Sequence, residues 1–372
     1  QAERIDIEAN AASTIEALSF SGALAATSGK DGAAGSFTGS GAASYNKIYS
    51  NVEAYIQDAQ TVQSTGDVNI KVEDSSSIDA NAIGASVALS SSSGGSSVSI
   101  SIQVSIAKNE INNIVQSYID NSSLNVADGE LNLSSIEKAS INTKAIGVAV
   151  SYSSGESSIS VSGGGSVALN HITGKNNAFI KDSIIEIGAS DNDLNLVAEN
   201  TANIKAIVPT VSFGSGASLG ISVARNIIGW NSNDYTADYT TAGTPATLSS
   251  GDTVKITTDP LDGDVYKYIG SGLSDADGLD LIGQNYGDRT AWEQVNLSDS
   301  PLEVMAYIQD SSINTSGDLY LKSRSEANIE AIVAAGSAAI AMSKDGSAVS
   351  VGGAGVYTEN KIQTYVKSYI SG

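Results

Sequence analysis

Two chemically versatile residue types are almost missing from this sequence of 372 residues. It contains no cysteine and a single histidine, His171. Disulfide bonds, cysteine nucleophiles and multi-histidine metal sites are therefore excluded within the chain, and histidine-based acid–base catalysis finds no support. A large β-protein that crosses a membrane unfolded has reason to avoid cysteine, so the absence fits an exported protein.

Basic residues and long apolar runs are also scarce. The chain has 19 Lys and Arg against 41 Asp and Glu, which gives a formal net charge of −22. This charge argues against nucleic acid and anionic lipid as partners. No apolar run reaches the roughly 18 residues of a membrane-spanning helix, and no signal peptide is visible. The opening stretch QAERIDIEAN fits inside a repeat, so we expect a segment of a longer protein.

Aromatic residues make up only 6% of the chain, whereas hydrophobic residues reach 41%, mostly Ala, Ile and Val. Apolar residues alternate with polar ones, as in VSISIQV (98–104), and no segment sustains a helical spacing. This pattern predicts an all-β chain of closely stacked strands.

A phrase of the type G-D-L-x-L recurs along the chain. GDVNI (66–70) returns as GELNL (129–133), NDLNL (192–196) and GDLYL (317–321), and RIDI (4–7) is an earlier copy. Copies therefore start near residues 4, 67, 130, 193 and 318, and the first four are 63 residues apart. A repeat of this regularity is typical of a solenoid.

A second landmark locates an insertion in the fourth copy. An Asn precedes an aromatic by nine residues in four copies, as in Asn46 and Tyr55, but Asn226 precedes Tyr307 by 81. We therefore predict solenoid repeats over 1–230, an inserted module at 231–301 and a solenoid continuation over 302–372. Copies also differ in length within the Ser/Gly-rich stretch. An odd deletion inside a paired strand would turn its core side outward, so we place these changes in a loop at SSSSGGSS (90–97) and its equivalents.

The predicted fold is a repetitive β-solenoid, similar to a parallel β-helix, with repeats of about 63 residues and a small inserted β module. A winding of a parallel β-helix takes roughly 18–25 residues, so we expect three windings per repeat, without direct stacking of the repeated tyrosines. One very wide winding per repeat, in which they would stack, is the alternative.

Ile and Val are expected to point inward, with Ser, Thr, Asn and Asp outward or in turns. The glycines before the recurring Asp are expected to adopt positive φ, and the recurring asparagines to shape turns.

The string AYIQDSSINTSGDLYL (306–321), echoed by AFIKDSIIEIGASDNDLNL (178–196), resembles the repeats of giant bacterial surface and secreted proteins, the filamentous-haemagglutinin-like adhesins with β-helical stalks. The resemblance covers roughly 300 residues. It implies an extracellular fibre with an adhesive role. The 63-residue period departs from the shorter repeats of haemagglutinin shafts.

The insertion differs in composition from the repeats. It carries 12 acidic and 3 basic residues. SGDTVKIT (250–257) and GDVYKYIGS (263–271) read as strands around a turn at DPLDG (259–263), and TAWEQV (290–295) is expected to close the sheet. We expect this module to hang from a loop of the solenoid, where it is the best place to look for recognition.

Two groups of residues in and beside the insertion are candidate sites. Four aromatic residues could stack on sugar rings, although we expect at least the tryptophans to form the module's core: Trp230, Tyr235, Tyr239 and Trp292. Three acidic residues around Gly278 hint at a calcium loop: Asp275, Asp277 and Asp280. The twelfth position counted from Asp275 is Tyr286, so the EF-hand pattern fails and a plain acidic turn is the expected structure. No other metal or cofactor is expected.

The function predicted from these features is a secreted or cell-surface structural segment, a rigid stalk that displays a binding module. The expected partners are copies of itself and cell-surface glycans or proteins, without membrane insertion. The alternative is a β-helix that binds or cleaves carbohydrate at the inserted module, since two carboxylates suffice for hydrolysis. An enzyme is not expected, because an active site needs residues that occur once. An ice-binding solenoid would need regularly spaced Thr, and none is present.

Overall fold

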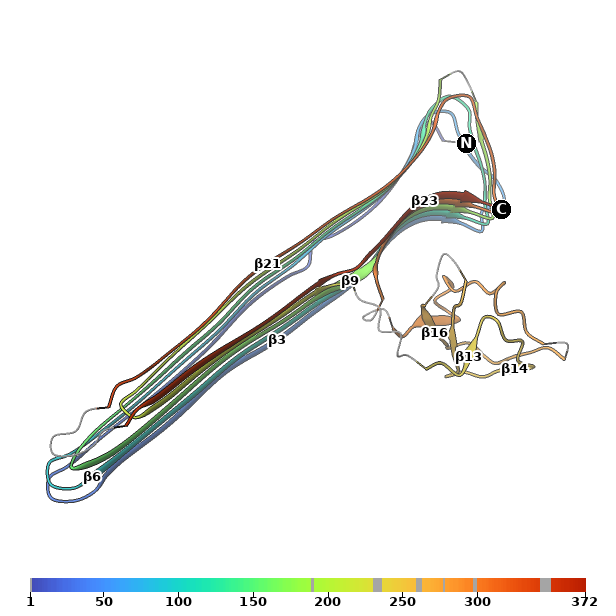
Figure 1. Ribbon diagram of the computed structural model, residues 1–372. Coiled ribbons are helices and arrows are strands. Elements are labelled where there is room, and N and C mark those ends of the chain that lie inside the picture. The colour runs from blue at the N-terminus through green and yellow to red at the C-terminus, as the bar shows by residue number, and fades with distance from the viewer. Residues whose placement is uncertain are drawn as a thin grey trace.

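The computed structural model describes residues 2–188, 191–229, 236–258, 263–276, 278–296, 300–341 and 349–372. Within these ranges the chain is all-β and contains no helix. Five windings of the chain stack on one another and build two long parallel sheets and one short one (Figure 1). The fold class predicted from the repeat, a β-solenoid, is confirmed.

The first long sheet collects the opening strand or strands of each winding. These are β1 (Ile5–Ala11), β2 (Thr14–Gly29), β5 (Val68–Ser92), β8 (Leu131–Ser154), β11 (Leu194–Gly214) and β21 (Leu319–Ala339). Equivalent residues of consecutive copies pair directly, as Ile78 does with Ile141.

The second long sheet collects the returning strands, and the short sheet closes each winding. The second long sheet contains β3 (Ala34–Gln57), β6 (Ser96–Asp120), β9 (Ser157–Lys181), β12 (Ala217–Ile228), β19 (Leu302–Gln309), β22 (Val351–Ile362) and β23 (Thr364–Ser371). The short sheet contains β4 (Val62–Ser64), β7 (Ser123–Val126), β10 (Ile184–Ile187) and β20 (Ser312–Thr315).

Each 63-residue repeat forms one wide winding, so the expectation of three windings per repeat is wrong. Strands of up to 25 residues span about 80 Å at roughly 3.3 Å per residue, and one circuit of three sheets uses the whole repeat. The repeated aromatic residues consequently stack. Tyr55 and Tyr118 have ring centroids 4.8 Å apart, and the stack continues through Phe179, Tyr307 and Tyr369 at spacings of 4.9 to 5.0 Å.

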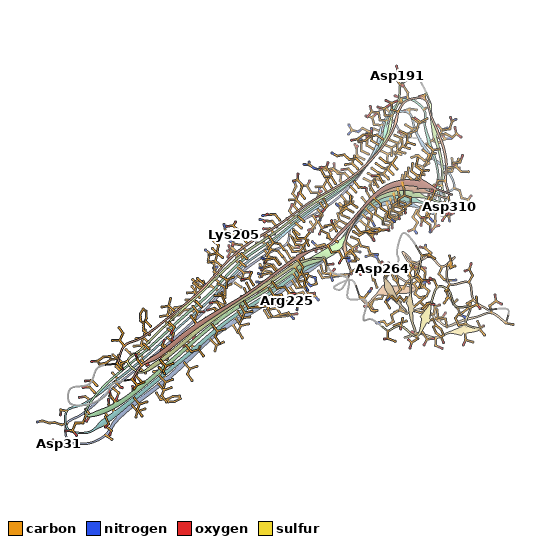
Figure 2. All side chains as sticks on the ribbon, viewed as in Figure 1. Asp31, Asp191, Lys205, Arg225, Asp264 and Asp310 are labelled. Carbon is orange, nitrogen blue, oxygen red and sulfur yellow. The ribbon has the colours of Figure 1, made fainter. Side chains whose placement is uncertain are left out.

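Each winding has two parts, which we call the head and the arm. In the head, all three sheets enclose a triangular core, whereas in the arm the two long sheets run side by side to a distant tip (Figure 1). We define the arm of the second winding as residues 82–107, where Ala, Gly, Ser and Gln lie between the two long sheets, and the head as the rest, which includes the triangular end and the aliphatic cluster of Ile78 and Ile111 beside it. Figure 2 marks the tip with Asp31 and a corner of the head with Asp191.

The head has the apolar core that the sequence predicts. Large aliphatic side chains such as Ile70, Ile119 and Leu131 are fully buried. A column of asparagines runs through the windings beside this core, and each amide bonds the next: Asn46, Asn109, Asn170, Asn226 and Asn360, at 2.8 to 2.9 Å. These asparagines lie within strands rather than in turns, so the predicted turn role is wrong for them.

The arm has the opposite arrangement, which contradicts the expectation that Ile and Val point inward throughout. Serines of the two long sheets meet in its interior, as in the 2.5 Å contact between Ser86 Oγ and Ser101 Oγ. Apolar side chains occupy the alternate, outward positions, and Ile102 is 47% exposed. No charged residue occupies an outward position of the arm strands in the second winding, 83–91 and 98–106.

Positive φ was expected at the glycines before the recurring Asp, but the structure places it at a column of Asp and Asn residues in the turns of the head. Positive φ occurs where the second long sheet passes into the short sheet, at Asp58, Asn121, Asp182 and Asp310, with φ between 46° and 54°. Gly66, in contrast, is not among the residues with positive φ. A Cβ there would meet the backbone oxygen of Glu3 at 2.5 Å. Close approach of neighbouring windings, and not positive φ, requires this glycine.

Length changes between the repeats fall at the arm tip, as the sequence predicts. Gly214 pairs with Ser151, 63 residues earlier, whereas Ala217 pairs with Val161, 56 residues earlier. Seven residues are therefore lost between Gly214 and Ala217, at the tip, and the inward and outward sides of the strands are unchanged.

The inserted module was expected to hang from a loop of the solenoid. It instead interrupts a strand of the second long sheet. Both β12 and β19 pair with the single long strand β9, so the chain leaves the sheet near Gly229 and rejoins it at Leu302. The module contains β13 (Tyr239–Thr240), β14 (Thr247–Leu248), β15 (Thr253–Lys255), β16 (Val265–Tyr268), β17 (Leu273–Ser274) and β18 (Trp292–Gln294). As predicted, β15 and β18 flank β16 in antiparallel order. The predicted turn at 259–263 falls mostly outside the described residues.

Candidate functional site

The inserted module has its own small aromatic core. Trp292 is 3% exposed and packs edge-on against Tyr268, with ring centroids 5.1 Å apart, and at 4.6 Å from Tyr286. The expectation that tryptophan forms the core is confirmed for this residue, so its ring faces are not free to stack on a sugar. Tyr239 is half-buried against the same core. Trp230 and Tyr235 lie outside the described residues.

The module is tied to the outer face of the second long sheet by ionic contacts. Arg289 of the module lies 2.7 Å from Glu53 of β3. Lys175 of β9 lies 2.6 Å from Asp264, which directly precedes β16. The two contacts join the module to the first and the third windings, so the module lies across several windings of the head.

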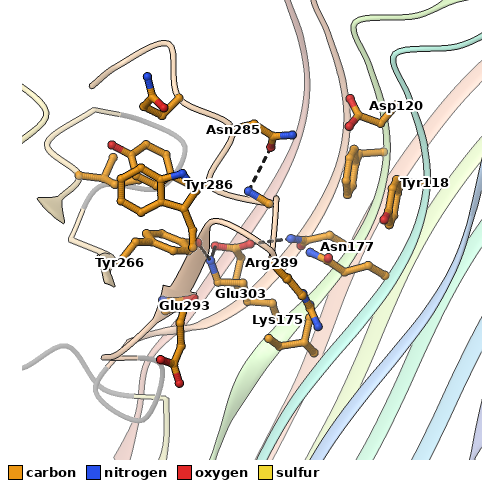
Figure 3. A pocket seen from close by; sticks show the side chains of 18 of the residues that line it. Tyr118, Asp120, Lys175, Asn177, Tyr266, Asn285, Tyr286, Arg289, Glu293 and Glu303 are labelled. Atoms are coloured by element: carbon orange, nitrogen blue, oxygen red, sulfur yellow. Dashed lines mark hydrogen bonds and ion pairs between the residues drawn. The ribbon is translucent and has the colours of Figure 1, made fainter. Parts of the chain in front are cut away.

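A cleft of about 870 Å³ lies between the module and the head (Figure 3). Its floor includes the aromatic column at Tyr118, Phe179 and Tyr307, and the module contributes Asn285 and Arg289. Many lining side chains are neutral amides: Gln57, Asn112, Gln116, Asn177, Gln284 and Gln309. Because the rings of the column are stacked on one another, the column offers the cleft ring edges and hydroxyl groups rather than open faces.

The carboxylates that line the cleft are all engaged within the described part of the chain. Glu53 pairs with Arg289, and Asp120 accepts a hydrogen bond from Gln57 at 3.3 Å. The other two are Glu293, which pairs with Lys267, and Glu303, which accepts a 2.6 Å hydrogen bond from Asn177.

Lys175 is the centre of a buried charged cluster at the base of the cleft (Figure 3). Its side chain is 7% exposed, and it donates hydrogen bonds to Asp264 at 2.6 Å and to the hydroxyl of Tyr266 at 3.0 Å. Glu303 lies 3.9 Å from the same Nζ atom. Burial alone would lower the pKa of Lys175, but the attraction of Asp264 and Glu303 outweighs it and holds this pKa well above its usual value. Burial raises the pKa of Glu303, and the charge of Lys175 opposes that rise.

Sequence reasoning missed this cluster, although the repeat contained a signal for part of it. Lys175 stands in a column with Asn51 and Ile114 of the first two windings and with Glu303 of the fourth. The first two windings are uncharged at this position, whereas the third and fourth carry the opposite charges of Lys175 and Glu303. Such a change within a regular repeat indicates a site that is not repeated along the chain. Asp264 belongs to the insertion and has no equivalent in the repeats, so its place beside Lys175 could not be read from the period.

The candidate calcium residues do not come together as a described site. Asp280 accepts hydrogen bonds from the backbone N–H groups of Ile282 and Gly283 at 3.0 and 3.2 Å, which is turn chemistry. Asp275 is exposed, and Asp277 lies outside the described residues. Across the described ranges, no three His, Cys, Asp or Glu side chains gather as a metal site requires.

A second buried ionisable group lies inside the head, away from the cleft. Glu137 is 0% exposed, and burial together with the charge of Asp74 raises its pKa to about 8. Asn200 donates a 2.8 Å hydrogen bond to Glu137, and Asn113 donates a 2.9 Å hydrogen bond to Asp74. These carboxyl groups belong to the internal columns of the solenoid.

Comparisons with protein-family models, with curated proteins and with solved structures gave no match. In the described part of the chain, no helix is long and apolar enough to cross a membrane.

Proposed function

We propose that this chain is a structural and adhesive segment of an extracellular bacterial fibre or giant surface protein. The in-register stack of windings carries this proposal, because each winding repeats the hydrogen bonds of the last and the stack can extend without a change of geometry. The resemblance of the repeats to the filamentous-haemagglutinin-like adhesins supports the extracellular location. In this proposal the module is displayed beside the stack, and the protein catalyses no reaction.

The proposed partner of the arm is another copy of the same chain. Its outward positions carry exposed apolar residues on both long sheets, among them Leu24 at 73% and Leu219 at 50% exposure. Exposed apolar patches of this kind mark interaction surfaces. The whole chain has a net charge of −22, so two copies repel one another. This repulsion is weakest where the facing surfaces carry no charged side chains. The outward faces of the arm strands, which carry no charge in the second winding, are therefore the surface on which copies can approach.

Sedimentation velocity over a range of concentrations, with electron microscopy of the same samples, tests this assembly. We expect the chain to self-associate and Ile102→Lys, which places a charge on the apolar face, to weaken association by about tenfold, roughly 1.4 kcal/mol. Thr201→Lys adds the same charge on the outer face of the head and is the matched control, with no loss expected. Self-association through the arm would be contradicted if the chain stayed monomeric at all concentrations. It would also be contradicted if the chain bound neutral lipid vesicles in a flotation assay instead of associating with itself.

Recognition of a neutral glycan in the cleft is a second candidate function, favoured by its lining of amides and tyrosine edges. A glycan array probed with the whole chain tests it. Gln116→Ala with Gln309→Ala, both in the cleft, should remove any signal, whereas Gln63→Ala, on the exposed side of β4, should not. Turnover of a polysaccharide that is lost on a single carboxylate substitution would instead indicate an enzyme.

A further inference from the structure

The contact between Lys175 and Asp264 places a primary amine against a carboxyl group inside the protein. The distance from Nζ to Oδ2 is 2.6 Å, and the two side chains are 7% and 8% exposed. The residues lie 89 positions apart, one in the solenoid and one in the module. Glu303, also 8% exposed, is 3.9 Å from Nζ. An amine, a carboxyl group and a third acidic group thus share one water-poor site.

Burial makes this ion pair expensive to maintain as separated charges. Removing two ions from water carries a penalty of several kcal/mol for each ion, against which the attraction between them works. A neutral amide in the same place would remove that penalty. Fixed reactants also gain from proximity, since intramolecular reactions reach effective molarities of about 10⁵–10⁸ M. Amide formation from an amine and an acid, which is unfavourable between dilute partners in water, becomes feasible under these conditions.

We propose that Lys175 and Asp264 form an intramolecular isopeptide bond that locks the module onto the solenoid. A proton first passes from the Lys175 ammonium to the Asp264 carboxylate, which gives a neutral amine and a neutral acid. The Nζ lone pair then attacks Cγ of Asp264. Glu303, as the acid, donates a proton to the Asp264 carbonyl oxygen while its second oxygen accepts a proton from Nζ.

The tetrahedral intermediate then collapses to the amide. One hydroxyl group on Cγ takes a proton from Glu303 and leaves as water, while the other hydroxyl group gives its proton back to Glu303 as the C=O bond re-forms. Glu303 thereby returns to its acid form. The sum is one ammonium and one carboxylate converted to one amide and one water, with no oxidant or other co-reactant. Tyr266 holds the amine in place, because its hydroxyl accepts a hydrogen bond from Nζ and its ring centroid lies 5.5 Å from that atom.

Intact mass measured under denaturing conditions tests the bond in the whole chain. We expect the folded, purified chain to be lighter than its sequence by one water, and a protease digest to contain a branched peptide joining Lys175 and Asp264. Glu303→Gln should restore the full mass (allowing for the substitution) and abolish the branched peptide, because the proton shuttle is removed. Lys175→Arg should do the same, since arginine keeps the charge without the nucleophilic amine.

The matched control uses an ion pair on the same sheet. Lys47 lies 2.9 Å from Glu110, but the lysine side chain is 46% exposed. Lys47→Arg should leave the missing water and the branched peptide unchanged. A full-length mass equal to the sequence, with the fold verified by circular dichroism, would overturn the proposal, as would a water still missing in Lys175→Arg. If Glu303→Gln fails to fold, the branched peptide of the unaltered chain decides the question.

Discussion

In the head, the inward column of the first long sheet carries Ile78 and Ile141, whereas further along the same strands the inward positions of the arm carry Gly84 and Ser86. The backbone pairing does not change between the two regions, since β5 and β8 remain in register along their length. What changes is the size of the side chains between the facing sheets. Large aliphatic residues hold the head open around a core, and small residues let the arm close.

This comparison shows that apolar residues in a solenoid have two separate uses. In the head they fill the core and remove apolar area from water. In the arm the β-branched residues Val104 and Ile106 face outward, where they favour the extended backbone but remain 42% and 39% exposed. The arm interior depends instead on hydrogen-bonded serines, as where Ser101 donates to the Ser86 carbonyl at 2.9 Å.

The largest predicted effect is a pH dependence of the free energy of unfolding, which we expect from the buried carboxyl group of Glu137 in the head. Glu137 has a folded-state pKa of about 8, above its ordinary value of 4.5. The folded chain therefore holds a proton that the unfolded chain releases, so stability is full below about pH 4.5 and falls as the pH rises to about 8. The contribution of Glu137 is up to about 5 kcal/mol. Glu137→Gln should remove it, and the smaller slope from other buried carboxyl groups with a raised pKa, such as Asp74 and Glu303, should remain. Urea unfolding at pH 5 and pH 8 measures this difference.

The control for this pH dependence is the arm. Gln103 is the arm's large buried polar residue, 1% exposed, and carries no titratable group. Gln103→Leu should therefore leave the slope of stability against pH unchanged, whatever it does to stability itself. An equal slope in Glu137→Gln and in the unaltered chain would contradict the assignment to the head.

A smaller effect compares two apolar residues of the same strand, β6. Ile119 of the head is fully buried, and Val104 of the arm is 42% exposed. Ile119→Ala should destabilise the fold by about 2–5 kcal/mol, whereas Val104→Ala should cost less than about 1 kcal/mol. Urea unfolding distinguishes them. A larger loss for Val104 would mean that the outer face of the arm is covered in the folded state.

The smallest effect compares two serines of the arm. Ser101 points inward and bonds Ser86, whereas Ser91 points outward. Ser101→Val adds volume between closely packed sheets and removes a hydrogen bond, so we expect a loss of about 1–3 kcal/mol. Ser91→Val should change stability by no more than about 0.5 kcal/mol. Thermal unfolding measures both, and equal midpoints would show that the arm interior tolerates larger residues.

The site illustrates where prediction from sequence ended. The antiparallel strands of the insertion were predicted correctly, because they rest on local patterns. The number of windings per repeat was predicted incorrectly, because strand length was inferred from more compact β-helices. The contact between Lys175 and Asp264 was missed, because it joins a repeated element to an insertion that obeys no period.

The sequence by itself determined the 63-residue repeat, the all-β class, the position of the insertion and the loops that absorb length changes, since each leaves a mark along the chain. Only the tertiary structure decided which of two alternating sets of residues faces inward. A pattern of period two has two equivalent phases, and the spacing of the opposite sheet selects between them. In the head that spacing admits Ile and Leu, and in the arm it admits Ser, Ala and Gly, so neighbouring stretches of one strand bury opposite kinds of residue.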